Sequence, residues 1–562
     1  HQTVRRHDIR AMLGYEEEHF VQRNGSLQKL GLQDASIGDP SSAATPYASS
    51  GSGYEWGARS VFARVNYALK ERYLFEANVR VDGSSRFAPA YRWGVFPSFS
   101  AGWRISEEPF LKSAHWIDNL KIRASWGQLG NNAIGNYEWQ STYGAANYVL
   151  GNTVNSGIAI TSIANVALEW EKTSVANVGV DFSFFNNRFT GSVDAYDKLT
   201  TGILYRPDMY MVMGTASAPR QNIADVSNRG IEVELGWKDS IGKDFYYGIT
   251  ANVSFNRNRV TKYKGELVAG WSEDPEGNPV YSTNIGDVST GSTTRVIEGH
   301  QINEWYLPDV YKGSGRYWNA DGSVNKDGGP RDGMIRTVDD MKWLRAMVEA
   351  GYTFYPSQNI GKAGLWYGEY IYADANGDGI YGNSYDSVFQ GTSTTPKYNY
   401  GLQFYAGWKG IDLSVSLSGA AGFSIYYYRM ASNSSATIYG YTIAESVAED
   451  HYFFDPKNPD DPRTNITSKQ PRLSNLSGND QSSASSSLHL EKGDFLKLRN
   501  VTIGYTLPEK ISKKIKAQSI RVFASGENLC AITGFSGMDP EMRATAGYST
   551  MRQYALGLNV TF

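Results

Sequence analysis

The sequence predicts an all-β fold, namely a transmembrane antiparallel β-barrel with long extracellular loops. Apolar and polar residues alternate with period two in many segments, each with one apolar and one polar face. The segments reach about 10–12 residues, the length of outer-membrane strands, whereas strands of globular proteins have a mode near 5–6. Aromatic residues are abundant (38 Tyr, 23 Phe, 14 Trp) and gather near strand ends, as interfacial girdles require. An ordinary antiparallel sheet with one wet face is the alternative, and strand length and number disfavour it.

Composition excludes several classes of protein. The 562 residues carry 54 Lys+Arg against 57 Asp+Glu, a balance that argues against a generic nucleic-acid binder. The single cysteine, Cys530, cannot form a disulfide within the chain. No apolar run approaches the roughly 18 residues of a spanning helix. The first residues, HQTVRRHDIR, contain neither an initiator Met nor an apolar signal core, so a removed leader or a start within a longer protein is expected.

The alternation assigns a lipid face and a lumen face to each strand. In Arg72–Asp82 the odd positions are apolar, and Phe245–Asn256 repeats the pattern. Val79, Val253 and Val415 are therefore expected to face lipid, whereas Asn252 and Ser254 are expected to face the lumen. Fourteen segments qualify as strands: 4–14, 57–69, 72–82, 94–105, 118–128, 173–185, 188–198, 229–237, 244–256, 398–408, 411–419, 495–507, 519–529 and 551–562.

The connections between the segments give the orientation. Tight links at Lys70-Glu71, Asn186-Asn187 and Lys409-Gly410 alternate with long excursions at 129–172, 257–397 and 420–494. Outer-membrane barrels have short periplasmic turns and long extracellular loops, so the tight links mark the periplasmic side. The aromatic residues beside these turns are expected to form the periplasmic girdle: Trp237, Phe245 and Trp408.

The last strand ends the chain on an aromatic residue. Gln553–Phe562 reads QYALGLNVTF, with large apolar residues on one face: Tyr554, Leu556, Leu558, Val560 and Phe562. Such a strand resembles the signal that bacterial barrel-assembly machinery recognises. Together with the alternation, it is a marker of an outer-membrane protein.

Several motifs in fixed order resemble a known family. Tyr67–Phe110 and Asn119–Tyr137 (NLKIRASWGQLGNNAIGNY) are followed near the C-terminus by GDFLKLRNVTIGYTLP (Gly493–Pro508), IRVFASGENL (Ile520–Leu529) and GMDPE (Gly537–Glu541). These stretches resemble the barrel of SusC-like TonB-dependent transporters, the outer-membrane importers of Bacteroidetes. The resemblance covers almost the whole chain.

The resemblance implies that residues 1–562 form the C-terminal part of a larger barrel. Such transporters have a signal peptide, a TonB box and a plug domain before a barrel of about 22 strands, and none of these front parts is read in this sequence. The fourteen strands would then be the later strands of that barrel. Residues 257–397 would form a long extracellular excursion and residues 420–494 a second one. Strand counting alone also allows a self-contained barrel, since fourteen is even.

One motif in the first excursion predicts a structural cation site. Asp374-Ala375-Asn376-Gly377-Asp378-Gly379-Ile380 places oxygen ligands at positions 1, 3 and 5, a Gly at position 6 and a backbone carbonyl at position 7. This spacing is that of a calcium loop, which supplies Ca²⁺ with oxygen ligands from one tight turn. Position 12 is Tyr385 instead of Glu, so Asp386 is expected to complete the shell. We expect Ca²⁺ more than Mg²⁺, and the alternative is an Asx- and Gly-rich turn that binds nothing.

No catalytic motif is evident, and an enzyme is not expected. The seven His are scattered without an HExxH or paired Cys/His spacing, and no G-x-S-x-G or phosphate-binding Gly-rich motif occurs. Aromatic residues in the long excursion are weak candidates for stacking on a glycan, and packing in the loop's own core or against a partner protein is the more favoured interpretation. They are Trp305, Tyr306, Trp318, Trp366 and Tyr367.

The resemblance implies active import of a nutrient across the outer membrane of a Gram-negative bacterium. The implied partners are a SusD-like surface lipoprotein, the TonB-ExbB-ExbD complex acting through the front part of the same protein, membrane lipid and the substrate, but no nucleic acid. An oligosaccharide is the expected substrate and a peptide the minority possibility. A non-transporting scaffold or adhesin whose loops bind surface partners is the alternative function, and a barrel enzyme is a third.

Overall fold

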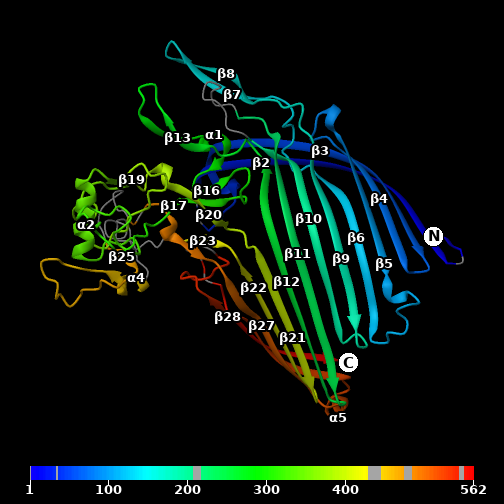
Figure 1. Ribbon diagram of the computed structural model, residues 1–562. Coiled ribbons are helices and arrows are strands. Elements are labelled where there is room, and N and C mark those ends of the chain that lie inside the picture. The colour runs from blue at the N-terminus through cyan, green and yellow to red at the C-terminus, as the bar shows by residue number, and fades with distance from the viewer. Residues whose placement is uncertain are drawn as a thin grey trace. The chain divides into compact units, whose positions relative to one another are not determined.

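A computed structural model describes residues 2–4, 6–32, 34, 36–206, 217–427, 445–473, 482, 484–542, 548 and 550–562. Among them, the largest sheet has fifteen strands in the order β1-β2-β3-β4-β5-β6-β9-β10-β11-β12-β21-β22-β27-β28-β29. Each strand therefore pairs with the next long strand along the chain, as in an up-and-down antiparallel sheet (Figure 1). No helix in the described ranges has the length and hydrophobicity of a membrane span.

The main strands match the fourteen predicted segments, and a three-residue strand precedes them. Their bounds are β1 Gln2–Val4, β2 His7–Leu32, β3 Ala43–Leu69, β4 Tyr73–Ser84, β5 Trp93–Arg104, β6 Ile117–Asn131, β9 Glu171–Phe184, β10 Phe189–Tyr205, β11 Gln221–Ile241, β12 Phe245–Lys262, β21 Tyr398–Trp408, β22 Ile411–Ala421, β27 Phe495–Thr506, β28 Ser519–Thr533 and β29 Gln553–Thr561.

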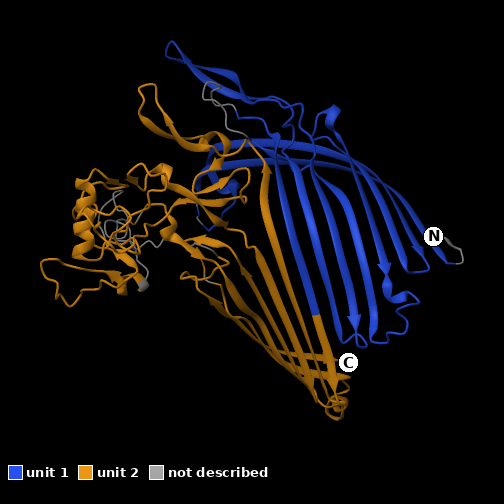
Figure 2. Cartoon of the chain, viewed as in Figure 1, with its two compact units in different colours: residues 1–235 blue, residues 236–562 orange. Residues whose placement is uncertain are grey.

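The chain divides into two compact units, residues 1–235 and residues 236–562 (Figure 2). Unit 1 contains β1–β10, including the hairpin β7 (Thr142–Leu150) and β8 (Thr153–Ser162), and most of β11. Unit 2 contains the end of β11, the strands from β12 to β29 and both long excursions. Each unit is described below by itself.

The tight links adopt left-handed backbone conformations. The last strand pairs before them are Leu69 with Tyr73, Phe184 with Phe189, and Trp408 with Ile411, so of the three links Lys409-Gly410 is the two-residue hairpin loop. Lys70 and Glu71 have φ of 55° and 56°, Asn186 and Asn187 have φ of 59° and 57°, and Lys409 precedes Gly410 at φ 88°. Positive φ at both central positions is the type I′ geometry whose twist matches that of the flanking strands. Asn and Gly adopt this conformation at low cost, and Lys and Glu at a higher one.

The two faces of the strands differ as the alternation predicts. Phe75, Val79 and Val253 are 51%, 40% and 44% exposed, so large apolar side chains point away from the protein on one face. Phe245 lies directly opposite Trp408 in the register of β12 and β21, at the ends beside the tight links. Exposed apolar side chains are unfavourable in water and favourable against lipid, so this apolar face is suited to a membrane.

The first two long strands extend far beyond the predicted segments. β2 and β3 stay paired from His7 and Leu69 to Leu32 and Ala43, with one irregularity at Gln28/Lys29. The segments 4–14 and 57–69 were predicted from apolar alternation, which fades in the remainder. That remainder is held by backbone pairing between the two strands.

The two excursions of unit 2 fold together around one apolar core, which the sequence did not predict. The first contains β13 (Ala269–Glu273), β14 (Pro279–Thr283), α1 (Ile285–Val288), β15 (Thr290–Gly291), β16 (Thr294–Val296), β17 (Glu304–Pro308), α2 (Val338–Glu349), β18 (Thr353–Phe354), β19 (Ile380–Tyr381) and β20 (Ser387–Ser393). The second contains β23 (Ser424–Tyr426), α4 (Glu445–Glu449), β24 (His451–Tyr452), β25 (Gln470–Arg472) and β26 (Leu490–Lys492). Trp343 and Leu344 of α2 are fully buried in a cluster that also includes Tyr452 of the second excursion.

Short helices complete the structure. Four-residue α5 (Glu509–Ser512) links β27 to β28. The 3₁₀ turns among the described residues are Pro40–Ser42, Pro89–Tyr91, Ile105–Glu107, Ser384–Asp386, Ser487–His489 and Lys513–Ile515. The Ser-rich stretch 474–487 lies mostly outside the described residues.

Candidate functional site

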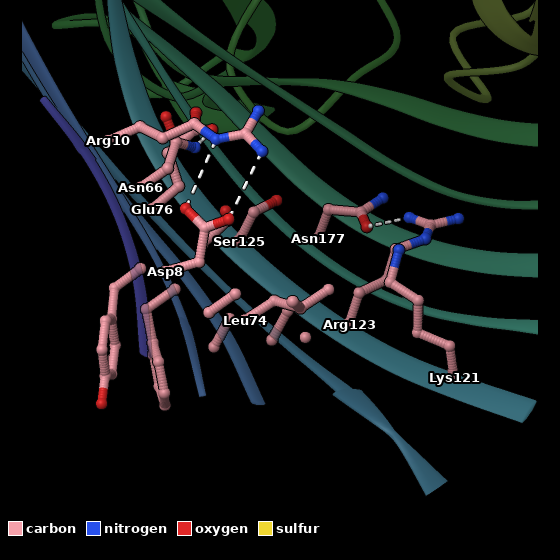
Figure 3. A pocket seen from close by; sticks show the side chains of 16 residues that line it. Asp8, Arg10, Asn66, Leu74, Glu76, Lys121, Arg123, Ser125 and Asn177 are labelled. Atoms are coloured by element: carbon pink, nitrogen blue, oxygen red, sulfur yellow. Dashed lines mark hydrogen bonds and ion pairs between the residues drawn. The ribbon is translucent and has the colours of Figure 1, made fainter. Parts of the chain in front are cut away.

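The polar face of unit 1 holds a pocket of about 550 Å³ that is lined by charged side chains (Figure 3). Arg123 of β6 donates two hydrogen bonds to Asp194 of β10, at 2.5 and 2.7 Å, and lies 3.1 Å from Asp181 of β9. Asp8 and Arg10 of β2 form a second pair on the same lining. Opposite charges on neighbouring strands form ion pairs with one another, so most of the charge on this surface is already neutralised within the protein.

The polar face of unit 2 holds a pocket of different chemistry, about 600 Å³ in volume. Its polar lining consists mainly of amides and hydroxyls, with one ion pair between Arg499 and Glu541. The lining residues are Asn252, Thr394, Pro396, Asn399, Tyr400, Gly401, Leu402, Gln403, Ser416, Leu417, Ser418, Gly419, Ala420, Phe423, Phe495, Arg499, Pro540 and Glu541. Asn399 and Tyr400 lie near the end of β21 that is remote from the tight link Lys409-Gly410. The pocket is thus at the end of the strands from which the long excursions emerge.

The predicted calcium loop folds as a tight turn around its own side chains. Asp374 Oδ1 accepts hydrogen bonds from the backbone N–H groups of Gly377 and Asp378, at 2.7 and 3.1 Å, and its Oδ2 accepts one from Gly379 at 2.9 Å. Gly377 and Gly379 have φ of 77° and 79°, which a residue with a side chain rarely adopts. The two glycines are therefore required for the turn that gathers these oxygens.

Asp386 is held in the same loop and is fully buried. Its Oδ1 accepts hydrogen bonds from the N–H groups of Ala375 and Asn376, at 2.7 and 3.4 Å, and its Oδ2 from Gly382 and Asn383, at 2.8 and 3.0 Å. Burial raises the pKa of Asp386 to about 6, against the opposing effect of these donors. Four donors use the lone-pair directions of one carboxylate. The arrangement therefore disagrees with the expectation that Asp386 completes a cation shell, and gives it a structural role.

The remaining oxygens fit a hard cation in type and spacing. Asp374, Asn376 and Asp378 supply carboxylate and amide oxygens from one turn. Asp374 and Asp378 each accept three hydrogen bonds within the loop, which leaves about one of the roughly four lone-pair directions of each carboxylate for a cation. Within the described residues, no group of three or more His, Cys, Asp or Glu side chains is arranged for a metal ion. A cation would thus depend on Asn376 and on a backbone carbonyl such as that of Ile380.

A neighbouring hairpin contacts this loop. Trp271 of β13 donates its indole N–H to the backbone oxygen of Asn376 at 3.1 Å. Tyr281, its cross-strand partner on β14, meets the ring of Tyr385 edge-on, with 5.7 Å between the ring centroids. The order of the hairpin and that of the loop are therefore coupled.

The aromatic residues that the sequence offered as glycan contacts are mostly packed inside the excursion. Trp305 is 7% and Tyr367 5% exposed, because both belong to packed interiors, and this burial removes them as ligand contacts in this arrangement. Tyr306 stacks beneath Arg295 at 5.2 Å, and Trp366 packs against the core of the excursion. Trp318 is 48% exposed.

An ionic cluster joins two of the sequence motifs, and the sequence analysis did not predict it. Lys497 of GDFLKLRN lies 2.6 Å from Asp539 and 2.6 Å from Glu541, both of GMDPE. Burial alone would raise the pKa of Asp539, but hydrogen bonds from Lys497 and Thr550 hold it below its ordinary value. A hydrogen bond from Arg499, together with Lys497, lowers the pKa of Glu541. The feature of the sequence that could have indicated this cluster is the opposite charge of the two motifs.

The large apolar side chains of the last strand, β29, are exposed on the surface of the protein. Tyr554, Leu556 and Leu558 are 73%, 87% and 62% exposed, and Phe562 is 80% exposed. β29 pairs with β28 from Ser519 and Thr561 to Glu527 and Gln553. The geometry places the proposed assembly residues on the same face as the other lipid-exposed side chains.

Comparisons with known proteins agree with this architecture. Residues 2–340 match the family model described as TonB dependent receptor-like, beta-barrel. The TonB-dependent receptor SusC of Bacteroides thetaiotaomicron is 28% identical over 575 residues, which cover 99% of this chain and 48% of SusC. TonB-dependent receptor P39 of Formosa agariphila is 30% identical over 529 residues, which cover 90% of this chain and 46% of the relative. The chain spans about half the length of the curated relatives it matches.

Among solved structures, the RagAB peptide transporter matches with a TM-score of 0.75 and 21% identity, over 99% of this chain and 53% of the matched chain. The RagAB peptide importer in its open-open state matches with a TM-score of 0.74 and 22% identity. These likenesses show that the chain shares the fold of the matched part of those chains. The chain belongs to the family of TonB-dependent receptor-like β-barrels of the bacterial outer membrane.

Proposed function

We propose that this chain supplies the wall and the extracellular mouth of an importer that moves a nutrient across the outer membrane. The membership of the family and the SusC-like relatives support this role. The observation that carries it is the polar face of the strands, which has pockets of several hundred Å³ opposite an apolar face suited to lipid. A wall of this kind encloses an aqueous lumen.

The proposed transport step also involves a plug, an energy-supplying complex and a cap. By analogy with the SusC-like relatives, a plug within the same full-length protein would respond to TonB-ExbB-ExbD, and a SusD-like lipoprotein would cap the mouth. The two excursions of unit 2, which share one apolar core, give such a cap a rigid surface to dock on. A non-transporting scaffold or adhesin would use the same loops without a substrate path.

The test is uptake by the source bacterium. Deletion of the gene, or of tonB, is expected to abolish uptake of one nutrient class from a panel of fluorescent oligosaccharides and short peptides, and the full-length gene is expected to restore it. Undiminished uptake of the whole panel, with loss of surface adhesion instead, would favour the scaffold. Affinity purification of the full-length protein should also recover a lipoprotein in equal amount.

For the substrate we propose an oligosaccharide, with a peptide as the second candidate. The resemblance of the sequence motifs to SusC-like transporters supports the first, and the structural likeness to the RagAB peptide transporter is the reason to keep the second. The uptake panel separates the two classes, because each is labelled with a different fluorophore.

We further propose that the loop 374–380 binds Ca²⁺ as a structural ion, with Mg²⁺ less favoured. The support is the oxygen-rich spacing of Asp374, Asn376 and Asp378 and the two left-handed glycines that gather them. Sites with few charged ligands bind Ca²⁺ weakly, and millimolar extracellular calcium suffices for them. An anomalous-scattering map from crystals of the full-length protein grown in calcium tests this directly.

A further inference from the structure

Two sequence motifs near the C-terminus meet on the polar face of unit 2. Residues Gly534–Glu541, here called the strap, follow β28 and include the motif GMDPE. Lys497 of β27 is 4% exposed and lies within hydrogen-bonding distance of both Asp539 and Glu541 of the strap. A buried ammonium needs such partners, so the ion pairs hold the strap against the strand.

Apolar and neutral polar contacts fix the other end of the strap. Phe535 is buried in a cluster with Phe423 and Phe495. Ser536 donates hydrogen bonds to Glu491 from its N–H and hydroxyl groups, at 2.9 and 2.7 Å. The strap is thus anchored at both ends and presents Pro540 and Glu541 as one wall of the mouth-side pocket.

A β-bulge aims Arg499 at the same wall. The register of β22 and β27 skips from Leu498 to Asn500, and so does the register of β27 and β28, so Arg499 has no cross-strand partner in either ladder. Bulges redirect a side chain and are enriched beside binding sites. The guanidinium donates to Ser418 Oγ at 2.6 Å and to Glu541 Oε2 at 2.8 Å.

Amide and hydroxyl side chains of β12, β21 and β22 also line the pocket, beside apolar residues such as Leu402 and Leu417. In the register of β12, β21 and β22, Asn252 is opposite Gly401, and Gln403 is opposite Ser416. Across the described ranges, the side chains of Asn252, Asn399, Gln403 and Ser416 have no hydrogen-bond partner. Gly401 leaves the space that Asn252 occupies, since a Cβ there would lie 3.0 Å from its amide oxygen.

The chemistry of this lining selects a class of ligand. Amides and hydroxyls each offer both donors and acceptors, which complements sugar hydroxyls that also do both. Arg499 pairs with Glu541, which also pairs with Lys497, and Lys497 has Asp539 as its second partner. The two cations and the two carboxylates compensate one another, so this wall offers an ionic ligand little free countercharge. We propose that the strap and the three strands form a binding subsite for a neutral oligosaccharide at the mouth of the lumen. This deepens the import function proposed above and rests on it.

The experiment uses the purified full-length protein and isothermal titration. The probes are hexasaccharides of glucose, xylose and mannose, acidic hexagalacturonate and an uncharged hexapeptide. The wild type is expected to bind a neutral hexasaccharide, and Gln403→Ala and Ser416→Ala to weaken that binding about 3- to 10-fold, as for the loss of one neutral hydrogen bond. Ser414→Ala is the matched control, because Ser414 lies two residues along β22 and does not line the pocket.

A second variant tests the charge argument. Glu541→Gln removes the countercharge of Arg499 with little change in shape, so binding of hexagalacturonate should appear or rise at least 5-fold, while the neutral ligand is held less tightly. Unchanged binding of the acidic probe would contradict the compensated pair as the selecting feature.

The remaining outcomes also decide the question. Wild-type affinity in both Gln403→Ala and Ser416→Ala, binding of the hexapeptide alone, or no binding of any neutral hexasaccharide would overturn the subsite. So would a structure of the full-length protein with plug side chains filling the pocket. Import itself is judged separately by the uptake assay, so a transporter that works with an unaltered Kd in these variants refutes the subsite and not the function.

Discussion

Lys497 Nζ lies 2.6 Å from both carboxylate oxygens of Asp539, although 42 residues separate the two in sequence. Their side chains are 5% and 8% exposed. A charge that is buried this deeply stays in the folded state only while its partner is present. The pair therefore determines where the strap Gly534–Glu541 lies on the polar face.

Removing this lysine should release the strap. Lys497→Ala leaves the Asp539 carboxylate buried without its cation, which is expected to destabilise the strap locally by about 3–5 kcal/mol. Hydrogen exchange of residues 534–541 in the full-length protein measures this, and the barrel should remain heat-modifiable. Lys513→Ala is the control, since its pair with Glu509 is exposed and screened by solvent and therefore contributes little to stability. Unaltered exchange in Lys497→Ala would contradict the anchoring role.

Charge on the two faces of β12 should have unequal effects. Val253→Arg places a charge on the lipid-facing side and should cost about 2–4 kcal/mol if it lies near the bilayer midplane. Ser254→Arg, one residue along and on the polar face, should be much better tolerated. The fraction of folded, heat-modifiable protein in outer membranes compares them, and equal losses would show that the register is wrong.

Acid should loosen the strap below about pH 4. The pKa values of Asp539 and Glu541 are lowered in the folded protein, so their contribution to stability is complete above the unfolded values near 4. It is lost as the pH falls through the lower folded values. A nitroxide label at Met538→Cys, in a Cys530→Ser background, should be immobile from pH 7 to 5 and mobile at more acidic pH. Mobilisation already between pH 7 and 5 would exclude these carboxylates as the cause.

Asp386 should prove structural. Asp386→Asn replaces an acceptor oxygen by a donor that faces backbone N–H groups, so each buried donor left unpaired is expected to cost about 1–3 kcal/mol. Hydrogen exchange of residues 374–386 should rise in the presence and absence of calcium alike. Asp339→Asn is the control, because Asp339 is exposed on α2 of the same excursion. If residues 374–386 of the Asp386→Asn variant were as well protected from hydrogen exchange as those of the wild type, the structural role of Asp386 would be contradicted.

Calcium removal should change the environment of Trp271, because its indole N–H donates a hydrogen bond to the carbonyl oxygen of Asn376. Chelation with EGTA is expected to loosen the loop and shift the Trp271 fluorescence to longer wavelength, with recovery at millimolar calcium. The signal of Trp271→Phe is subtracted to isolate this residue. Asp378→Ala should give the chelated spectrum at every calcium concentration, and an unchanged wild-type spectrum on chelation would contradict a structural ion.

The strands of the large sheet could be predicted from the amino-acid sequence alone. Alternation along a strand such as Phe245–Asn256 is a local record of two environments, lipid on one side and water on the other, and it predicted β12 and its partners together with the tight links. The helix α2 was also accessible, because Thr337 and Asp340 form a capping box that the sequence displays. The sequence-based prediction did not include this helix, whose apolar side is buried by residues far away in the sequence, such as Tyr452.

The roles of the candidate site residues could not be predicted from the sequence, because they depend on contacts between distant segments. Whether Trp305 is a ligand contact or a core residue depends on which residues pack over it. Its contact with Tyr426, which is far away in the sequence, cannot be predicted from the residues around it. Likewise, the acidic spacing around Asp374 did not reveal that Asp386 is saturated by backbone donors. The meeting of Lys497 with Asp539 follows from pairing of β27 with β28 and the return of the chain across the lumen face. Local periodicity encodes which face a residue is on, whereas contacts between distant segments depend on the loops that connect them.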